Sequence, residues 1–166
     1  MSENNTLSNQ TNYEKVLDFM KAFGQNLYST PQPHLIESNP GLTKLRLDLI
    51  QEEVKELSDA IQQNNFVEVV DALADILYVV YGAGGAFGVD LDEAFDIVHK
   101  SNMTKLCKTE QEAKLTIEWY KENEQRYKDP AYRLSGDEKY WIVYDKATGK
   151  VLKSINYTPA NLTKFS

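Results

Sequence analysis

The clearest chemical signal in the sequence is a group of glutamates on the apolar side of a predicted helix. At 100° per residue, Glu53 and Glu56 continue a stripe that leucines form earlier in residues 42–61, and Glu52 lies at the edge of that stripe. Glutamates that only keep a helix soluble would face away from its apolar side. These three residues are therefore candidates for a chemical role.

The next predicted helix, residues 66–87, carries acidic residues in the one sector that is not apolar. Glu68, Asp71 and Asp75 fall in this sector. Asp71 and Asp75 stand four residues apart, so two like charges lie on successive turns, which costs a few tenths of a kcal/mol even in water. Partial burial raises the cost to several kcal/mol for each unpaired ion. The first 107 residues hold 7 basic and 16 acidic side chains, too few cations to neutralise this group.

A divalent cation would neutralise these carboxylates, and the donor types indicate which one. Mg²⁺ and Mn²⁺ prefer carboxylate oxygen and water, so we expect Mg²⁺, with Mn²⁺ as a substitute. A di-iron helical bundle needs Glu-x-x-His pairs, and neither His34 nor His99 has a glutamate three residues before it. Residues 90–93 lack the spaced acidic loop of an EF-hand. Because Mg²⁺ serves phosphate chemistry far more often than redox chemistry, a phosphorylated substrate is favoured.

Hydrophobic periodicity and helix-capping residues predict the elements that must position these side chains. The predicted helices cover residues 13–26, 40–63, 66–87, 91–102 and 109–127. Strands at 140–144 and 151–155, with a turn at 146–149, are predicted to form a β-hairpin. The sequence thus predicts an all-α bundle of four to five helices with a small C-terminal β-hairpin. The chain is predicted to comprise a disordered N-terminus (1–12), a helical core (13–107) and a C-terminal extension (108–166).

Composition excludes several classes of protein. The 166 residues carry a net charge of −7, which argues against a general nucleic-acid-binding protein because phosphate neutralisation needs a basic surface. No apolar run is long enough to span a membrane, and the polar start lacks the apolar region of a signal peptide. A lone cysteine, Cys107, excludes an internal disulfide framework. We therefore expect a soluble, cytoplasmic protein that binds neither nucleic acid nor membrane.

The acidic residues match a known family pattern. Residues 52–56 read EExxE, and residues 71–78 read DALADILY. Together with Phe23-Gly24-Gln25, Arg46 and the run His99–Lys105, they resemble the all-α nucleoside triphosphate pyrophosphohydrolases. This superfamily includes MazG-like, phosphoribosyl-ATP pyrophosphohydrolase-like and dimeric dUTPase-like proteins. Residues 149–159 are similar to tail extensions of the HisE-like branch.

The sequence departs from the superfamily pattern at one position. The usual pattern is ExxD, but Ala72 stands three residues before Asp75. Either Glu68 or Asp71 could take the missing ligand role. Asp71 is favoured, because a carboxylate one turn before Asp75 projects over the same position.

The resemblance implies cleavage of an NTP or dNTP between the α and β phosphates, giving the monophosphate and pyrophosphate. It implies Mg²⁺ held by Glu53, Glu56, Asp71 and Asp75, with Glu52 orienting or deprotonating the attacking water. The expected phosphate contacts are Asn102, Lys105, Lys153 and Tyr157. The expected base pocket comprises Phe19, Phe23, Gln25 and Asn26.

Two alternatives remain open from the sequence. One is phosphoribosyl-ATP hydrolysis, and the other is a non-catalytic helical dimerisation module whose acids pair with lysines of a partner subunit. The resemblance also implies a homodimer or homotetramer. The nearly all-apolar segment 66–87 agrees with burial beyond what one small bundle supplies.

Overall fold

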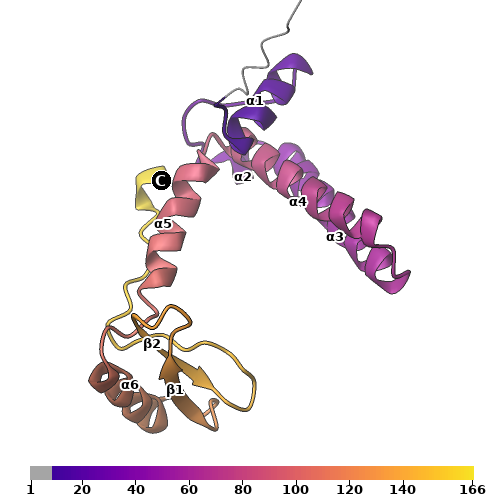
Figure 1. The fold of residues 1–166 in the computed structure, drawn as a ribbon. Coiled ribbons are helices and arrows are strands. Elements are labelled where there is room, and N and C mark those ends of the chain that lie inside the picture. The colour runs from indigo at the N-terminus through magenta and orange to yellow at the C-terminus, as the bar shows by residue number, and fades with distance from the viewer. Residues whose placement is uncertain (1–8) are drawn as a thin grey trace, which may run out of the picture. The chain divides into compact units, whose positions relative to one another are not determined.

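The computed structural model describes residues 9–166 as two compact units (Figure 1). The first unit comprises residues 9–94 and 162–166, and the second comprises residues 95–161. The regular elements of the described part of the chain are helices and one small two-stranded sheet, which confirms the predicted fold class. The division falls at residue 94, whereas the sequence suggested residue 107. Of the predicted disordered segment 1–12, residues 1–8 lie outside the described residues.

The first unit is built around a pair of long helices, α3 (Pro40–Gln62) and α4 (Phe66–Phe87), which pack side by side (Figure 1). Helix α1 (Asn12–Ala22) packs on α4, and the short α2 (Leu35–Ser38) packs on α3. The side chains of Asn39 and Asn65 cap the N-termini of α3 and α4, each by accepting a hydrogen bond from a backbone N–H in the first turn of its helix. These local signals explain why the predicted bounds of both long helices are confirmed to within two residues.

Helix α1 ends earlier than the sequence predicts, so the expected end at residue 26 is wrong. Gly24 adopts a left-handed backbone with φ of 63°. Its N–H donates to the Lys21 carbonyl at 3.2 Å, and the Gln25 N–H donates to the Met20 carbonyl at 2.9 Å. These bonds close the helix C-terminus in the manner of a glycine cap. Gln25 and Asn26 therefore lie in a loop rather than on the helix.

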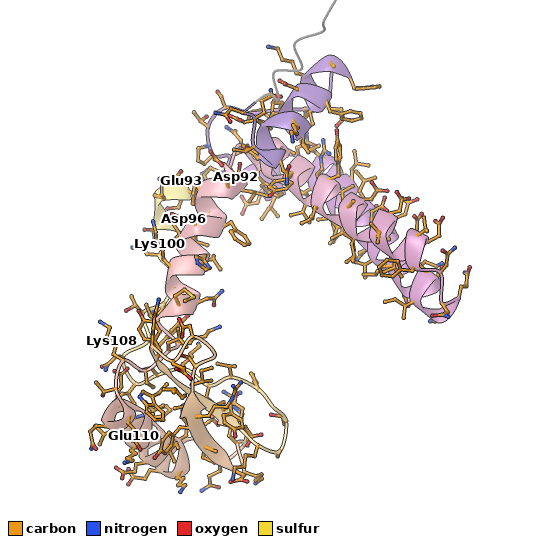
Figure 2. All side chains as sticks on the ribbon, in the orientation of Figure 1. Asp92, Glu93, Asp96, Lys100, Lys108 and Glu110 are labelled. Atoms are coloured by element: carbon orange, nitrogen blue, oxygen red, sulfur yellow. The ribbon has the colours of Figure 1, made fainter. Side chains whose placement is uncertain are left out.

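The C-terminal end of α4 packs closely on the rest of the first unit. The hydrophobic core of the first unit comprises Val16, Met20, Leu35, Leu42 and Ala86. A Cβ at Gly85 would lie 2.8 Å from the Met20 sulfur, so any larger residue there would require the side chains packed against it to shift. The C-terminal 3-10 helix η1 (Thr163–Phe165) belongs to this unit, and its Lys164 forms an ion pair with Glu93. Glu93 lies in the first turn of α5 (Leu91–Met103) and is labelled in Figure 2.

Replacing Gly88 by alanine is expected to destabilise the first unit. Gly88 has φ of 68°, and a Cβ there would lie 1.9 Å from the Thr30 carbonyl oxygen. The left-handed backbone alone costs an alanine about 1–2 kcal/mol, and the clash with main chain adds to this. Urea denaturation followed by circular dichroism would measure the loss. The matched control is Gly24→Ala, which has the same backbone hand but no atom within 4 Å of its Cβ; equal losses in both variants would contradict the clash.

The second unit packs one helix on a two-stranded sheet. Helix α6 (Glu110–Asn123) lies against β1 (Pro130–Leu134) and β2 (Trp141–Asp145), which pair antiparallel with Pro130 opposite Asp145. Glu110, the first residue of α6, is labelled in Figure 2. The core of this unit comprises Cys107, Ala113, Tyr120, Val143 and Leu152. Helix α6 ends four residues before the predicted residue 127.

The predicted β-hairpin is confirmed only in part: β2 and the turn after it form, and Tyr144 bridges to Val151 in the predicted antiparallel sense, but the second strand does not extend to residue 155. Strand β2 pairs with the preceding β1, and residues 151–155 form no second strand. The other edge of β2 is shared: Cys107 exchanges two 2.8 Å backbone hydrogen bonds with Trp141, and Val151 makes a single bridge to Tyr144. Beyond that bridge, the N–H of Lys153 donates to the Tyr120 hydroxyl instead of to a strand. Tertiary contacts therefore override the alternating pattern of this segment.

Among residues 9–166, the structure has no helix that is both long and apolar enough to cross a membrane.

Candidate metal and nucleotide site

The packing of α3 against α4 brings the predicted acidic residues into one electrostatic group. Burial raises the pKa of the Glu53 carboxyl above its usual value. Four neighbouring carboxylates raise it further: in decreasing order of effect, these are Glu56, Asp75, Glu52 and Asp71. The two helices thus place the other four predicted catalytic and metal-binding carboxylates close enough to act on Glu53.

One oxygen of Glu53 is left in an unfavourable environment. Glu53 is half-buried, and its Oε2 is shielded from solvent with no hydrogen-bond partner in the described part of the chain. Leaving a buried charged group without a partner costs well over 1 kcal/mol. Asp75 is half-buried, whereas Glu52, Glu56 and Asp71 are exposed. The orphaned oxygen and its oxygen-rich surroundings suit a hard divalent cation.

The carboxylates are near one another without forming a ready-made cage. Within residues 9–166, no three His, Cys, Asp or Glu side chains are arranged as a set of metal ligands. Like charges repel at short range, so carboxylate side chains turn apart unless a cation lies between them. Mg²⁺ is usually bound by one or two carboxylates together with water and substrate phosphates rather than by a closed protein cage. The loosely arranged carboxylates of α3 and α4 suit this mode of binding.

The structure bears on the choice between Glu68 and Asp71. Asp71 is exposed and is one of the four carboxylates with the largest effect on the pKa of Glu53, whereas Glu68, in the first turn of α4, is not one of these four. Ala72, which occupies the place of the usual ExxD glutamate, is only 3% exposed. These placements favour Asp71 as the residue that compensates for the missing glutamate.

Two of the four predicted base-pocket residues form an aromatic group. The rings of Phe19 and Phe23 stack with centroids 4.3 Å apart, and Phe19 meets Tyr78 edge-on at 5.5 Å. Tyr78 follows Asp75 by three residues, so the aromatic group adjoins the carboxylates on α4. Sequence reasoning did not assign Tyr78 to the site, although its position in the acidic sector of the helix was a usable signal. Asn26 is exposed in the loop after α1.

Gln25 interacts with a buried cation. Its Oε1 accepts a hydrogen bond of 3.2 Å from Nη2 of Arg46, which is 6% exposed. Burial lowers the pKa of Arg46. Gly82 of α4 leaves room for this guanidinium, since a Cβ there would lie 3.1 Å from Nη1. Gln25 therefore helps to hold Arg46 between helices, a role that the sequence did not reveal.

The four predicted phosphate contacts all lie in the second unit. Asn102 is exposed on the last turn of α5, and the carbonyl of Lys105 accepts the Ser154 N–H at 3.2 Å. Lys153 Nζ lies 4.5 Å from the ring centroid of Tyr157. The Tyr157 hydroxyl accepts a hydrogen bond from Ser101 at 3.2 Å, which fixes the tail on α5. Their contacts with a phosphate remain predictions.

Comparison with known proteins identifies the family of this chain. A long acidic helix pair in an all-α fold is the architecture expected of a nucleotide pyrophosphohydrolase. The family model for phosphoribosyl-ATP pyrophosphohydrolase matches residues 16–102, just over half of the chain. The protein therefore belongs to the phosphoribosyl-ATP pyrophosphohydrolase family, within the all-α NTP pyrophosphohydrolase superfamily. It is also 32% identical to an uncharacterized protein of Acanthamoeba polyphaga mimivirus, over 87% of this chain and 91% of the viral protein.

Proposed function

We propose that this protein is a Mg²⁺-dependent nucleoside triphosphate pyrophosphohydrolase, which cleaves an NTP or dNTP between the α and β phosphates. Family membership supports a nucleotide pyrophosphohydrolase-type activity. The observation that carries the proposal is the buried, unpartnered Oε2 of Glu53 among four further carboxylates. A divalent cation near this group would stabilise its charged form, and the phosphates of a nucleoside triphosphate bind such cations.

Each carboxylate has a separate task in the proposed reaction. Glu53, Glu56, Asp71 and Asp75 would hold Mg²⁺, with Mn²⁺ as a substitute. The bound ion supplies charge neutralisation and alignment of the phosphate chain. Glu52, which is exposed beside the group, accepts a hydrogen bond from the attacking water and takes its proton. Holding water and phosphate in one orientation accounts for much of the rate enhancement in such reactions.

Other predicted residues bind the remainder of the substrate. The stacked rings of Phe19 and Phe23, together with Tyr78, offer apolar faces for a nucleobase. Asn102, Lys105, Lys153 and Tyr157, the predicted phosphate contacts, all belong to the second unit, and no step of the proposed reaction is assigned to them. Arg46 and Gln25 are assigned to the structure of the first unit rather than to base recognition, because they bind each other.

Phosphoribosyl-ATP hydrolysis is the second candidate, because the matching family model carries that description. The discriminating experiment is a panel of NTPs, dNTPs and phosphoribosyl-ATP incubated with the protein and Mg²⁺, with pyrophosphate as the readout. We expect release from at least one nucleoside triphosphate and none after chelation of the metal. Turnover of phosphoribosyl-ATP alone would favour the second candidate. No release from any substrate would favour the non-catalytic dimerisation module.

We also propose that the protein assembles as a homodimer, or as a homotetramer built from such dimers. Four large apolar side chains recur along one line of α4 and are 48–78% exposed: Phe66, Val70, Leu73 and Leu77. On α3, Leu47, Val54 and Ile61 recur every seven residues and are 50–60% exposed. Fully burying one such side chain contributes about 1.5–3 kcal/mol. A second copy of the same helix pair would cover these residues.

A further inference from the structure

A concave surface that combines cations with aromatic rings lies wholly within the second unit. It is a pocket of about 340 Å³ between the end of α6, the turn after β2 and the tail. Its basic lining residues are Lys105, Arg126, Lys150 and Lys153, and its aromatic ones are Trp119, Tyr120 and Tyr127. Glu124 is its single acidic lining residue. The pocket therefore concentrates positive charge in a chain whose net charge is −7.

Most of this positive charge has no acidic partner. Glu124 pairs with Arg126 at 2.9 Å. No carboxylate of residues 9–166 lies within 4.0 Å of the ammonium groups of Lys105, Lys150 or Lys153. Three lysines without counter-charges on the lining of one pocket attract an anion, most strongly one with several charges, because a concave surface focuses the field.

The aromatic side chains give the pocket a second recognition element. The guanidinium carbon of Arg126 and the ammonium of Lys150 lie 5.0 and 5.5 Å from the ring centroid of Tyr127. Trp119 is 47% exposed and meets Tyr120 edge-on at 5.1 Å. A neighbouring pocket of about 520 Å³ shares Trp119, Tyr120 and Lys153 with the first. Stacking of a nucleobase on an exposed aromatic ring contributes about 1–3 kcal/mol.

The walls of the pocket are held by the core of the second unit. Tyr120 and Leu152 are 7% and 2% exposed. The Lys153 N–H donates to the Tyr120 hydroxyl at 3.0 Å, and the neighbouring Ser154 N–H donates to the Lys105 carbonyl at 3.2 Å. These bonds fix the backbone of both lysines before any ligand arrives. A preformed site loses less conformational entropy on binding than a flexible one.

We propose that this pocket binds the phosphates of a free nucleotide without a metal ion, while the exposed face of Trp119 contacts the base. The size of the two adjoining pockets falls within the 300–1,000 Å³ range of small-molecule sites. The choice of a nucleotide rests on the proposed function, but the binding of a polyphosphate anion does not. The site thus adds a metal-independent binding step to the metal-dependent carboxylate group of the first unit.

Calorimetric titration of the full chain with dTTP in the presence of EDTA tests the proposal. Without metal the carboxylates of α3 and α4 repel a triphosphate, so the titration isolates the cationic pocket. We expect saturable binding, with at least tenfold weaker affinity in Lys150→Glu. The matched control is Lys139→Glu, an exposed lysine in the β1–β2 connection that does not line the pocket, and its affinity should change less than twofold.

A second variant distinguishes the contribution of the base to binding from that of the phosphates. Trp119→Ala should weaken dTTP binding at least fivefold but leave the affinity for inorganic triphosphate unchanged. Absence of metal-free dTTP binding, or equal effects of Lys150→Glu and Lys139→Glu, would overturn the proposal. Much tighter binding of a 20-residue oligothymidylate than of dTTP would also overturn it, by identifying a nucleic-acid surface. Loss of pyrophosphate release in the substrate panel with metal-free binding intact would instead overturn only the proposed function.

Discussion

The Glu53→Gln variant is expected to lose pyrophosphate release by a factor on the order of 10³, the scale of removing one key electrostatic group from an active site. Glutamine keeps the size of the side chain but removes the charge at the centre of the carboxylate group. The buried Oε2, which has no hydrogen-bond partner in residues 9–166, then no longer attracts a cation. Steady-state pyrophosphate release at several Mg²⁺ concentrations would measure the loss. Restoration by tenfold more Mg²⁺ would indicate weakened metal binding rather than lost chemistry.

The same variant should also lose the response of thermal stability to metal. Binding of Mg²⁺ or Mn²⁺ to the folded wild type raises its free energy of unfolding, by about 2.7 kcal/mol at one hundred times the dissociation constant. The control is Asp48→Asn on the same helix, which removes an exposed carboxylate paired with Lys44. It should keep both turnover and the metal response. Retained pyrophosphate release in Glu53→Gln would rule out the assignment of the carboxylate group.

The pH dependence of thermal stability in the metal-free protein tests the raised pKa of Glu53 independently. Because burial and neighbouring carboxylates raise its pKa, the folded state holds this proton more tightly than the unfolded state. Its contribution to stability is present at low pH and is lost as pH rises from about the ordinary value of 4.5 through the raised value. Melting temperatures in EDTA should therefore fall more steeply with pH in the wild type than in Glu53→Gln. Parallel curves would contradict the raised pKa.

A single charge on the exposed stripe of α4 is expected to break the proposed oligomer. Leu73 lies within the stripe that Phe66, Val70 and Leu77 complete, and it is 48% exposed in the single chain. Leu73→Asp would bury an unpaired carboxylate between subunits, at a cost of several kcal/mol. Since each 1.4 kcal/mol is a factor of ten in the dissociation constant, association should weaken at least about 10²-fold. Light scattering across a dilution series would measure the mass.

The matched control for this variant is Ile36→Asp. Ile36 is 65% exposed on the short helix α2, outside the α3 and α4 stripes. Its substitution should leave the mass unchanged, and circular dichroism should show the same helix content in both variants. A wild-type protein that is monomeric at every concentration would exclude the oligomer. An unaltered mass in Leu73→Asp would place the interface elsewhere.

The sequence by itself determined the elements whose signals are local. The periodic apolar residues and the capping asparagines Asn39 and Asn65 set the bounds of α3 and α4. The same periodicity placed Glu53 and Asp75 in sectors that face a shared surface, and their oxygen donors indicated the kind of cation. These features depend on neighbours within one or two helical turns, so the order of residues along the chain contains them.

Only the tertiary structure decided the features that join distant residues. Strand β2 pairs with β1 along one edge and meets Cys107 and Val151 along the other. The contact of Phe19 with Tyr78, and the gathering of Lys105, Lys150 and Trp119 around one pocket, join segments tens of residues apart. The orphaned oxygen of Glu53 is also a result of helix packing. Such properties arise because packing competes with local preference, and the outcome of that competition depends on contacts that no short window of sequence contains.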